Sequence, residues 1–419
     1  MAITINSSPS VLQPVYNPFY WNVISSNVGQ PNFRYVVDIY TGATASTYVS
    51  RLRILPRPVT TTCVTSPARV LESYISYDRG VYSNIGGTPT QNEILQYTIE
   101  FGEEYGSTTT GTTTYANLNV ATGYTWNAVV PYDQLSPSVF SFNFYILSGN
   151  NSNSNFLTNM PSTVYFKNAT DRASLSWINN WQTPTLTAPG FLTVIVSHTS
   201  GGTSTYEIRN DGWTGATPQA IINHFGIGPW NLNNTPASLF LLGTPVSGTG
   251  IFNFNTDYQY TVQAYYNGFT GPLSKIQTYV LDDCTKYIPV RLQWLNELGG
   301  WDYFNFSLIS RKTISANRGT YKKTLAYNYT VGDRGTTVID VTSNESVLVT
   351  GNYINDDISS WLSKSLMTST EVYEQKTDGT ILPIIISDSD KERLKRINDR
   401  LYNYEFNYTY AFPVATQRN

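Results

Sequence analysis

Apolar and polar residues alternate along much of this chain, as in strands that bury one face and expose the other. Over residues 402–410, five aromatic side chains share one face and polar residues occupy the other. Three earlier runs, at 33–39, 95–101 and 258–264, alternate in the same way. Such strands are typical of antiparallel sheets with one solvated face. The sequence therefore predicts an all-β protein built from tandem antiparallel β-sandwich-like domains.

Helical signals are few and short. Two segments begin with a hydroxyl residue followed by proline, which suits an N-cap and the first helical position, and Gly226 can close the second. A third segment follows Asn355 or Asp356, either of which can cap it, and carries an apolar stripe that includes Trp361 and Leu362. We predict short helices over about residues 66–77, 218–225 and 356–367.

The segment 388–400 supports two interpretations. Ser389 and Glu392 form a capping box, and Glu392 can pair with Arg396 one helical turn later, which predicts a helix. Strong strand patterns flank the segment on both sides, however, and an Asn398-Asp399 turn could join them as a long hairpin. We favour the hairpin.

Composition shifts near Pro131 and after Leu281 suggest two domain boundaries. Polar tracts at 107–114 and 149–155 read as a hairpin tip and an exposed loop, because such runs cannot bury apolar surface. We predict an N-terminal β domain with one short helix, a middle β-sandwich, and a C-terminal β domain with one helix and a terminal hairpin. Their ranges are 1–133, 134–282 and 283–419.

The charge composition limits the classes of partner that the chain is expected to bind. Charged residues make up 13% of the 419 residues, about half the usual share, and the net charge is −3. A nucleic-acid partner is not expected, because such proteins usually carry a basic excess. Two basic stretches, Arg311–Lys323 and Lys391–Arg400, are interleaved with other polar residues, so we interpret them as solvated strand faces.

The ends and the cysteines give little further information. The first residues show no basic and apolar signal segment, and no apolar run is long enough to span a bilayer, so we expect synthesis in a cytoplasm and no membrane insertion. Cys63 and Cys284 lie far apart in sequence, and we interpret them as two isolated buried thiols, although one disulfide is possible.

Residues that could support catalysis are sparse. His198 and His224 are the only histidines, neither has metal-type spacing, and no nucleophile-elbow motif is present. We interpret both as hydrogen-bonded histidines at the surface or rim, although a Ser-His-Asp or Cys-His arrangement is spatial and stays open. The acidic pairs are adjacent in sequence and would diverge on a strand, which makes them poor partners for glycoside hydrolysis. These pairs are Glu103-Glu104, Asp282-Asp283 and Asp356-Asp357. We predict no catalytic residue, no cofactor and no metal site.

Aromatic residues are in excess, with nine Trp and 32 Tyr. Most should form cross-strand pairs, but exposed aromatics beside Ser, Asn and Thr also suit interfaces and glycan-stacking surfaces. The candidates that we select for an interface or recognition role are Trp126, Trp181, Trp213, Trp230 and Trp301.

Three stretches together carry a resemblance. The first runs from Trp21 to Ser76, the second from Cys284 through the run Leu292-Gln293-Trp294-Leu295-Asn296-Glu297-Leu298-Gly299-Gly300-Trp301-Asp302, and the third joins Ser360-Trp361-Leu362 to the segment 398–404. This pattern resembles virion-associated proteins of tailed bacteriophages, notably those of Bacteroidetes hosts. The resemblance covers both ends of the chain well and the middle loosely.

The resemblance implies a location in the virion and no catalytic residues. We therefore expect a non-enzymatic structural component of a bacteriophage particle, most simply an oligomeric tail, baseplate or neck protein. Its partners would be further copies of itself and other virion proteins. One alternative is a receptor- or carbohydrate-binding fibre or adhesin that contacts a host-surface glycan, and a second is a polysaccharide depolymerase.

Overall fold

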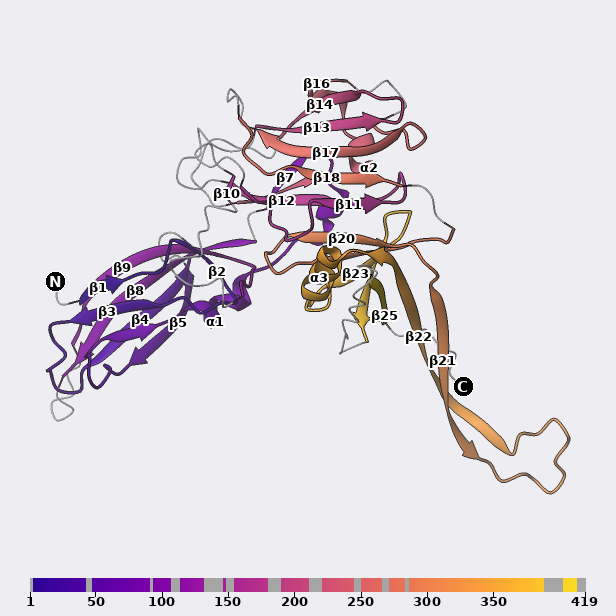
Figure 1. Cartoon of the computed structure of the whole chain (residues 1–419). Coiled ribbons are helices and arrows are strands. Elements are labelled where there is room, and N and C mark those ends of the chain that lie inside the picture. The colour runs from indigo at the N-terminus through magenta and orange to yellow at the C-terminus, as the bar shows by residue number, and fades with distance from the viewer. Residues whose placement is uncertain are drawn as a thin grey trace.

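The computed structural model describes residues 3–42, 47–90, 93–106, 114–131, 146–147, 154–179, 190–210, 221–244, 250–265, 271–282, 286–387 and 402–412. Within these ranges the strands form five sheets, and most strand pairs are antiparallel. The all-β, sandwich-like fold predicted from the alternation is confirmed. Figure 1 shows two sandwich-like bodies, a further sheet, and one long hairpin that extends away from them.

The N-terminal sandwich packs a three-stranded sheet against a five-stranded one. Alternate residues of the facing strands, such as Trp21, Tyr35 and Phe101, fill the core between the sheets, and Cys63 is a free, buried thiol within it. Cys284 lies outside the described residues. The smaller sheet contains β1 (Ile3–Ser7), β3 (Trp21–Ser25) and β6 (Cys63–Thr65); the larger contains β2 (Leu12–Pro14), β9 (Thr114–Trp126), β8 (Ile94–Tyr105), β4 (Arg34–Thr41) and β5 (Thr47–Ile54).

The first predicted helix is present but shorter than expected. It comprises α1 (Ala68–Leu71), followed directly by the 3₁₀ turn η1 (Glu72–Tyr74). Pro67 occupies the N-cap position, so the Ser66 side chain does not cap the helix as predicted. The predicted hairpin around 107–114 is supported by its strands, because β8 and β9 pair antiparallel up to Tyr105 and Thr114. Residues 107–113 themselves lie outside the described residues.

The chain then enters the middle body before the N-terminal sandwich is complete. After η2 (Gly80–Ser83), β7 (Gly87–Thr90) pairs with β15 (Ile222–Gly226) and so extends a sheet of the middle body. The chain returns to the N-terminal sandwich with β8. Part of the predicted domain 1–133, strand β7, therefore belongs to the middle body. The boundary near 133 itself stays a prediction.

The middle body packs a four-stranded sheet near a six-stranded one. Trp177 and Phe225 from the first sheet and Val194, Tyr260 and Val262 from the second share one core. The first sheet contains β10 (Ile146–Leu147), β12 (Ser174–Asn179), β15 and β7; the second contains β11 (Thr163–Phe166), β18 (Gln277–Leu281), β17 (Asp257–Tyr265), β13 (Phe191–His198), β14 (Thr203–Arg209) and β16 (Phe240–Leu242). Helix α2 (Pro229–Asn233) and the 3₁₀ turn η4 (Ala237–Leu239) connect them.

The predicted helix at 218–225 is wrong over 222–225, and residues 218–220 lie outside the described residues. Residues 222–226 form strand β15, and all five are buried. Asn223 bonds Asn210 and His224 bonds Ser176 and Glu93, so strand pairing satisfies polar residues that on a helix would have faced solvent. Gly226 ends this strand and closes no helix. The helix that the prediction missed is α2, which begins at Pro229.

The C-terminal body is one seven-stranded antiparallel sheet with a helix on one face. Asn355 caps α3 (Asp356–Ser365) by accepting a hydrogen bond from the Ile358 amide, as predicted, and Trp361 and Leu362 pack into the core beneath the helix. The sheet runs in the order β20 (Trp301–Phe306), β19 (Val290–Leu295), β23 (Val372–Gln375), β24 (Ile381–Ile386), β25 (Tyr402–Tyr410), β22 (Thr336–Ile354) and β21 (Arg311–Lys322). Strands β24 and β25 pair antiparallel, while the ambiguous connection 388–401 lies outside the described residues.

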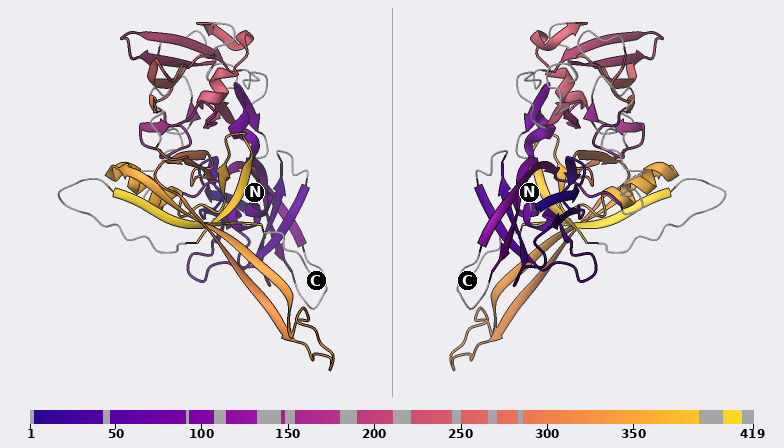
Figure 2. Two further views of the ribbon diagram at one scale, coloured as in Figure 1. Left: turned by 90° about the vertical axis from the view of Figure 1, so that its right-hand side faces the viewer. Right: turned by 90° about the vertical axis from the view of Figure 1, so that its left-hand side faces the viewer.

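The turn between β19 and β20 is where the three bodies meet. Asn296 donates a hydrogen bond from its side chain to the Leu157 carbonyl of the middle body, at 2.9 Å. Trp126 of the N-terminal sandwich donates from its indole to the Leu298 carbonyl, at 3.0 Å. Trp301 in turn donates to the carbonyl of Asp78, at 2.9 Å. This turn and the first residue of β20 therefore bond both other bodies, whose arrangement Figure 2 shows from two further sides.

Glycine is required at this turn because neighbouring backbone comes very close. A Cβ atom on Gly300 would lie 2.2 Å from the Leu157 carbonyl oxygen, and one on Gly299, whose φ is +82°, would lie 2.3 Å from the Asn127 carbonyl oxygen. No rearrangement of a flexible side chain can relieve either contact, since both partners are backbone atoms.

We expect Gly300→Ala to destabilise the chain by about 1–3 kcal/mol, the usual cost of overpacking a buried site. Gly271→Ala is the matched control, because a Cβ atom there meets nothing within 4 Å. Urea unfolding followed by tryptophan fluorescence measures both. Equal midpoints for the two variants would contradict the role of this turn.

Candidate functional site

The most unusual surface of the molecule is the β21–β22 hairpin. Residues 311–345 are here called the arm. From the pair Ile314 and Glu345 outward, its strands pair only with each other, because β22 reaches its second neighbour, β25, at Ser346. All twelve residues of β21 are exposed. At about 3.4 Å per residue, twelve residues extend roughly 40 Å, and Figure 1 shows the arm leaving the body along its whole length.

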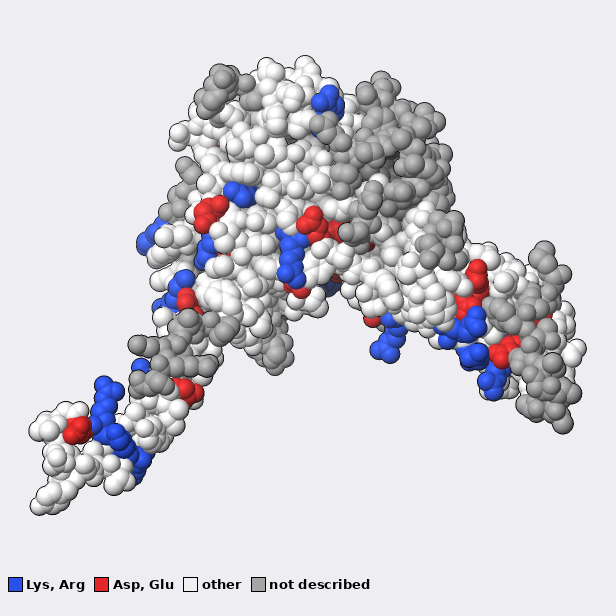
Figure 3. All heavy atoms as spheres, turned by 180° about the vertical axis from the view of Figure 1, so that it is seen from behind, with Lys and Arg blue, Asp and Glu red and all other residues white. Residues whose placement is uncertain are grey.

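Lys and Arg follow the arm (Figure 3). Its sequence holds six Lys or Arg against three Asp or Glu, a formal charge of +3. Because the whole chain carries −3, the remainder carries −6. The predicted solvated strand face at 311–323 is confirmed as exposed strand, whereas Lys391–Arg400 lies outside the described residues.

The base of the arm is fixed by a small polar cluster. Lys312 lies 3.3 Å from the Glu345 carboxylate across the hairpin and 3.5 Å from the Tyr410 hydroxyl on β25. Tyr410 donates its own hydroxyl hydrogen to Glu374, at 2.6 Å. The direction in which the arm leaves the sheet is therefore set by side chains of the body.

Both histidines sit between a serine and a carboxylate. His224 contacts Glu93 at 2.5 Å and Ser176 at 2.7 Å, and all three residues are buried. The predicted surface or rim position is therefore wrong for His224, although its hydrogen bonding is confirmed. Burial opposes ionisation of Glu93, but His224, together with hydrogen bonds from Thr90 and the Asp78 amide, outweighs it and lowers the pKa of this carboxyl. No substrate can reach this group, so it joins β15, β12 and the segment before β8 as a structural clasp.

The second arrangement is more accessible. His198 ends β13, and Nδ1 lies 2.7 Å from Asp257, its cross-strand neighbour on β17. Its Nε2 lies 2.8 Å from the Ser204 hydroxyl on β14. A carboxylate only accepts hydrogen bonds, so a neutral His198 carries its proton on Nδ1 and accepts from Ser204. The sequence left this possibility open, and the structure brings the three residues together at one end of the sheet.

The adjacent acidic pairs diverge as strand geometry predicts. Glu103 points inward, where Ser25 and Asn27 donate to it, whereas Glu104 points outward to Arg53, at 2.8 Å. Asp356 and Asp357 lie in the first turn of α3, where negative charge complements the helix dipole. Asp282 pairs with Lys167, and Asp283 lies outside the described residues.

The structure places the tryptophans selected from the sequence in different environments. Trp126 and Trp301 are buried, at 0% and 3% exposure, and both donate hydrogen bonds at the junction of the bodies. This corrects their assignment as recognition residues, because neither can reach a partner. Trp230 is half-buried beneath the Arg172 guanidinium, 3.8 Å from the ring centre. Trp181 and Trp213 lie outside the described residues.

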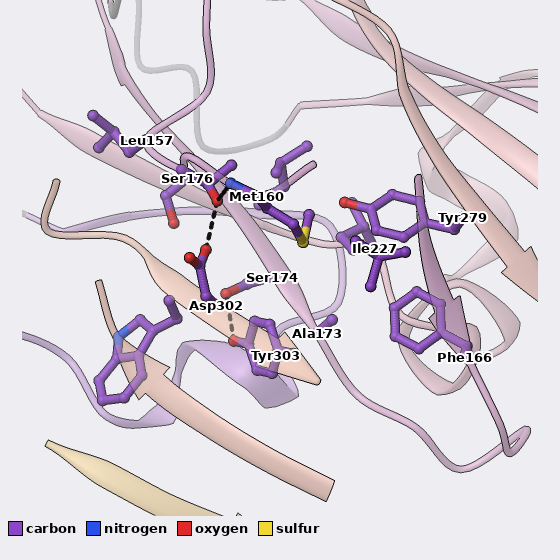
Figure 4. Close-up of a pocket in the computed structure, with 14 residues that line it drawn as sticks. Leu157, Met160, Phe166, Ala173, Ser174, Ser176, Ile227, Tyr279, Asp302 and Tyr303 are labelled. Carbon is purple, nitrogen blue, oxygen red and sulfur yellow. Dashed lines mark hydrogen bonds between the residues drawn. The ribbon is translucent and has the colours of Figure 1, made fainter. Parts of the chain in front are cut away.

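An enclosed cavity lies where β20 crosses the middle body. Figure 4 shows Asp302, Tyr303 and Ser174 beside apolar side chains such as Met160 and Phe166. Its volume of about 10 Å³ accommodates one water molecule at most. The cavity therefore cannot hold a substrate.

Asp302 is the notable residue of this cavity. One carboxylate oxygen accepts from Thr158 and Asn296, and the other accepts from Trp361, at 2.8 Å. Complete burial nevertheless raises the pKa of Asp302 to about 7. This carboxyl therefore changes its protonation near neutral pH at the point where α3, β20 and the middle body meet.

Comparisons with known proteins give no family. No family model matches the chain. No curated protein matches it either. Among solved structures, a marsupial T cell receptor matches at 8% sequence identity and a TM-score of 0.18, over 82% of this chain and 96% of that chain. At that TM-score the likeness carries no argument.

Two further features bear on function. Among the described residues, no group of three or more His, Cys, Asp or Glu side chains could hold a metal ion. Within the same ranges, no helix has both the length and the apolar character needed to cross a bilayer. The arm was missed in the sequence, although part of its signal is visible: β21 has no continuous apolar face, and the thirteen residues 323–335 that follow it include Gly332 and Gly335.

Asp302 predicts an unusual pH dependence. The carboxyl has a pKa of about 7 in the folded chain against a reference value of 3.8, so the folded chain alone holds this proton between those pH values. The contribution of the Asp302 carboxyl to the free energy of unfolding therefore falls by roughly 4 kcal/mol as the pH rises from about 4 to 7. We expect Asp302→Asn to lose this dependence. Urea midpoints at pH 5 and pH 8 test it, and parallel changes in wild type and variant would refute it.

Proposed function

We propose that the chain is a non-enzymatic structural subunit of a tailed-bacteriophage particle, in its tail, baseplate or neck, and that it assembles with further copies of itself and other virion proteins through the arm. The observation that carries the proposal is the arm itself. A two-stranded hairpin without a covering layer is marginally stable in water, so one with every β21 residue exposed is best explained as an element that a partner covers.

The surface chemistry supports the same proposal. The arm exposes large apolar side chains along its length, among them Ile314, Tyr327 and Val331. Burying them against a partner would be favourable, at roughly 25 cal/mol per Å² of apolar surface. The low overall charge reduces the desolvation cost of covering broad surfaces. The sequence resemblance to virion-associated proteins supplies the location.

Shortening the arm tests this role. Residues 316–343 can be deleted and replaced by Asn-Gly, because Ser315 and Asn344 are cross-strand partners that a two-residue turn can connect. We expect the full-length chain to form oligomers and the shortened chain to be monomeric, with an unchanged fold. Analytical ultracentrifugation and circular dichroism measure the two properties.

Val59→Ser is the matched control, since Val59 is 93% exposed but lies on the N-terminal sandwich. It should leave the oligomer intact. A full-length chain that stays monomeric and is absent from purified particles would exclude the proposed function.

The Ser204-His198-Asp257 arrangement favours a second candidate function, hydrolysis of esters. In that reaction the Ser204 oxygen would bond to the acyl carbon while His198 takes its proton, and the proton would pass to the departing alcohol as the ester bond breaks. Water would then release the acid. This candidate ranks second because the three residues lie outside the cavities described above, and a hydrolase also needs donors for the developing oxyanion.

The two histidine groups provide their own control for this candidate. A fluorophosphonate probe should label Ser204 if the group is a nucleophilic site, and Ser204→Ala should abolish the labelling. Ser176 also contacts a histidine that pairs with a carboxylate, but it is only 3% exposed, so Ser176→Ala should change nothing. If mass spectrometry of the intact protein finds no adduct, this candidate is excluded.

A further inference from the structure

We infer that the tip of the arm docks into the cleft between the N-terminal sandwich and α3 of a second copy of this chain. The inference rests on the proposed function and adds the two surfaces that meet. The tip comprises residues 323–335, and the cleft is defined below.

The tip is a preformed projection. Two turns shape it, with the Tyr329 amide bonded to the Ala326 carbonyl and the Asp333 amide bonded to the Thr330 carbonyl. The Asp333 carboxylate accepts from the Thr330 amide at 2.7 Å, and this bond lowers the pKa of Asp333. A loop held in this way loses little conformational entropy when it binds.

Two side chains of this loop are fully exposed to solvent. Tyr327 and Val331 are each fully exposed, at 105% and 106%, and Tyr329 is 61% exposed. An aromatic side chain at the end of a rigid projection is the kind of residue that anchors protein interfaces. The tip thus has the form of an anchor that enters a hollow.

The molecule offers such a hollow where the N-terminal sandwich meets the end of α3. Two adjoining depressions of about 310 and 440 Å³ share Tyr16. The first is lined by residues 127–129, Glu297 and Thr368–Thr370, and the second by α1 and the segment that precedes it. We call the two together the cleft. Tyr16 and Val129 are 49% and 42% exposed on its walls, so it presents apolar surface beside hydroxyl groups.

The occupant must come from another molecule. Figures 1 and 2 show the tip at the distal end of the arm, away from the junction of the N-terminal sandwich and α3. In this arrangement the tip does not reach the cleft of its own chain. Charge favours a second copy, because the tip carries a net +1 from two basic residues and Asp333, and the charged residues that line the cleft, Arg69, Glu72 and Glu297, carry a net −1.

This contact would be heterologous, since the tip and the cleft are different surfaces. Each subunit offers one of each, so successive subunits join head to tail. Such contacts close into a ring when the rotation between subunits permits, and otherwise continue as a filament. A ring agrees with the proposed position in a tail, baseplate or neck.

Cross-linking between two single-cysteine populations tests the contact. One population carries Tyr327→Cys and the other Thr370→Cys, both in a Cys284→Ser background, with the buried Cys63 retained. A short bismaleimide should join the two populations when mixed. Tyr327→Cys mixed with Val59→Cys is the control and should give no product above background.

Affinity gives an independent measurement. Tyr327→Ser should weaken self-association roughly 30-fold, as expected for an aromatic anchor. Thr370→Trp, an exposed position whose larger side chain fills the cleft, should weaken it comparably. Tyr353→Ser, at 70% exposure but on the body, should leave it unchanged. Sedimentation over a concentration series measures all three.

The outcomes separate the inference from the proposed function. If oligomers need the arm but the tip and cleft do not cross-link, the inference is overturned and the structural role stands. If the arm binds a different particle protein or a glycan and not a second copy, the inference is also overturned. A chain that neither self-associates nor enters particles overturns both.

Discussion

The hairpin formed by β19 and β20 is buried on both faces, and the arrangement of the molecule depends on it. Trp301 and Tyr303 point into the core of the middle body, while Phe304 and Phe306 pack with α3. A strand that is buried on both faces does not follow the usual alternation of apolar and polar residues. It belongs to two cores at once, and so it couples the middle and C-terminal bodies into one unit.

The same hairpin also places polar side chains in this buried environment. Arg291 is buried between the rings of Phe166 and Tyr303 and bonds Gln375 and the Arg172 carbonyl. Burial lowers the pKa of this guanidinium, which the nearby Asp171 partly opposes. Buried charges of this kind add little net stability, but removing one partner leaves the other uncompensated. They favour one packing arrangement over its alternatives.

Much of the fold could be predicted because period-2 patterns report local burial directly. Strands β4, β8, β17 and β25 all follow the runs that predicted them. The false helix at 218–225 shows the limit of such reasoning. Asn223 and His224 look solvent-facing by type, yet their partners lie 13 and 131 residues away in sequence. No local pattern records a partner so distant.

The candidate site was less predictable, for a related reason. Composition indicated an excess of aromatic residues, but it could not say which ones were exposed. Trp126 and Trp301 are large and therefore looked like anchors, whereas they hold the bodies together. Tyr327 drew no attention in the sequence, because its exposure follows from the length of the hairpin that carries it and not from its neighbours.

The strand β7 has a consequence for how this protein is made. Its last residue, Thr90, is bonded to Ile222, 132 residues further along the chain. At about 5–20 residues per second on the ribosome, β7 waits roughly ten seconds for its partner to emerge. Pro89 within β7 has no amide hydrogen to offer a foreign strand, which protects the waiting edge from mispairing during synthesis.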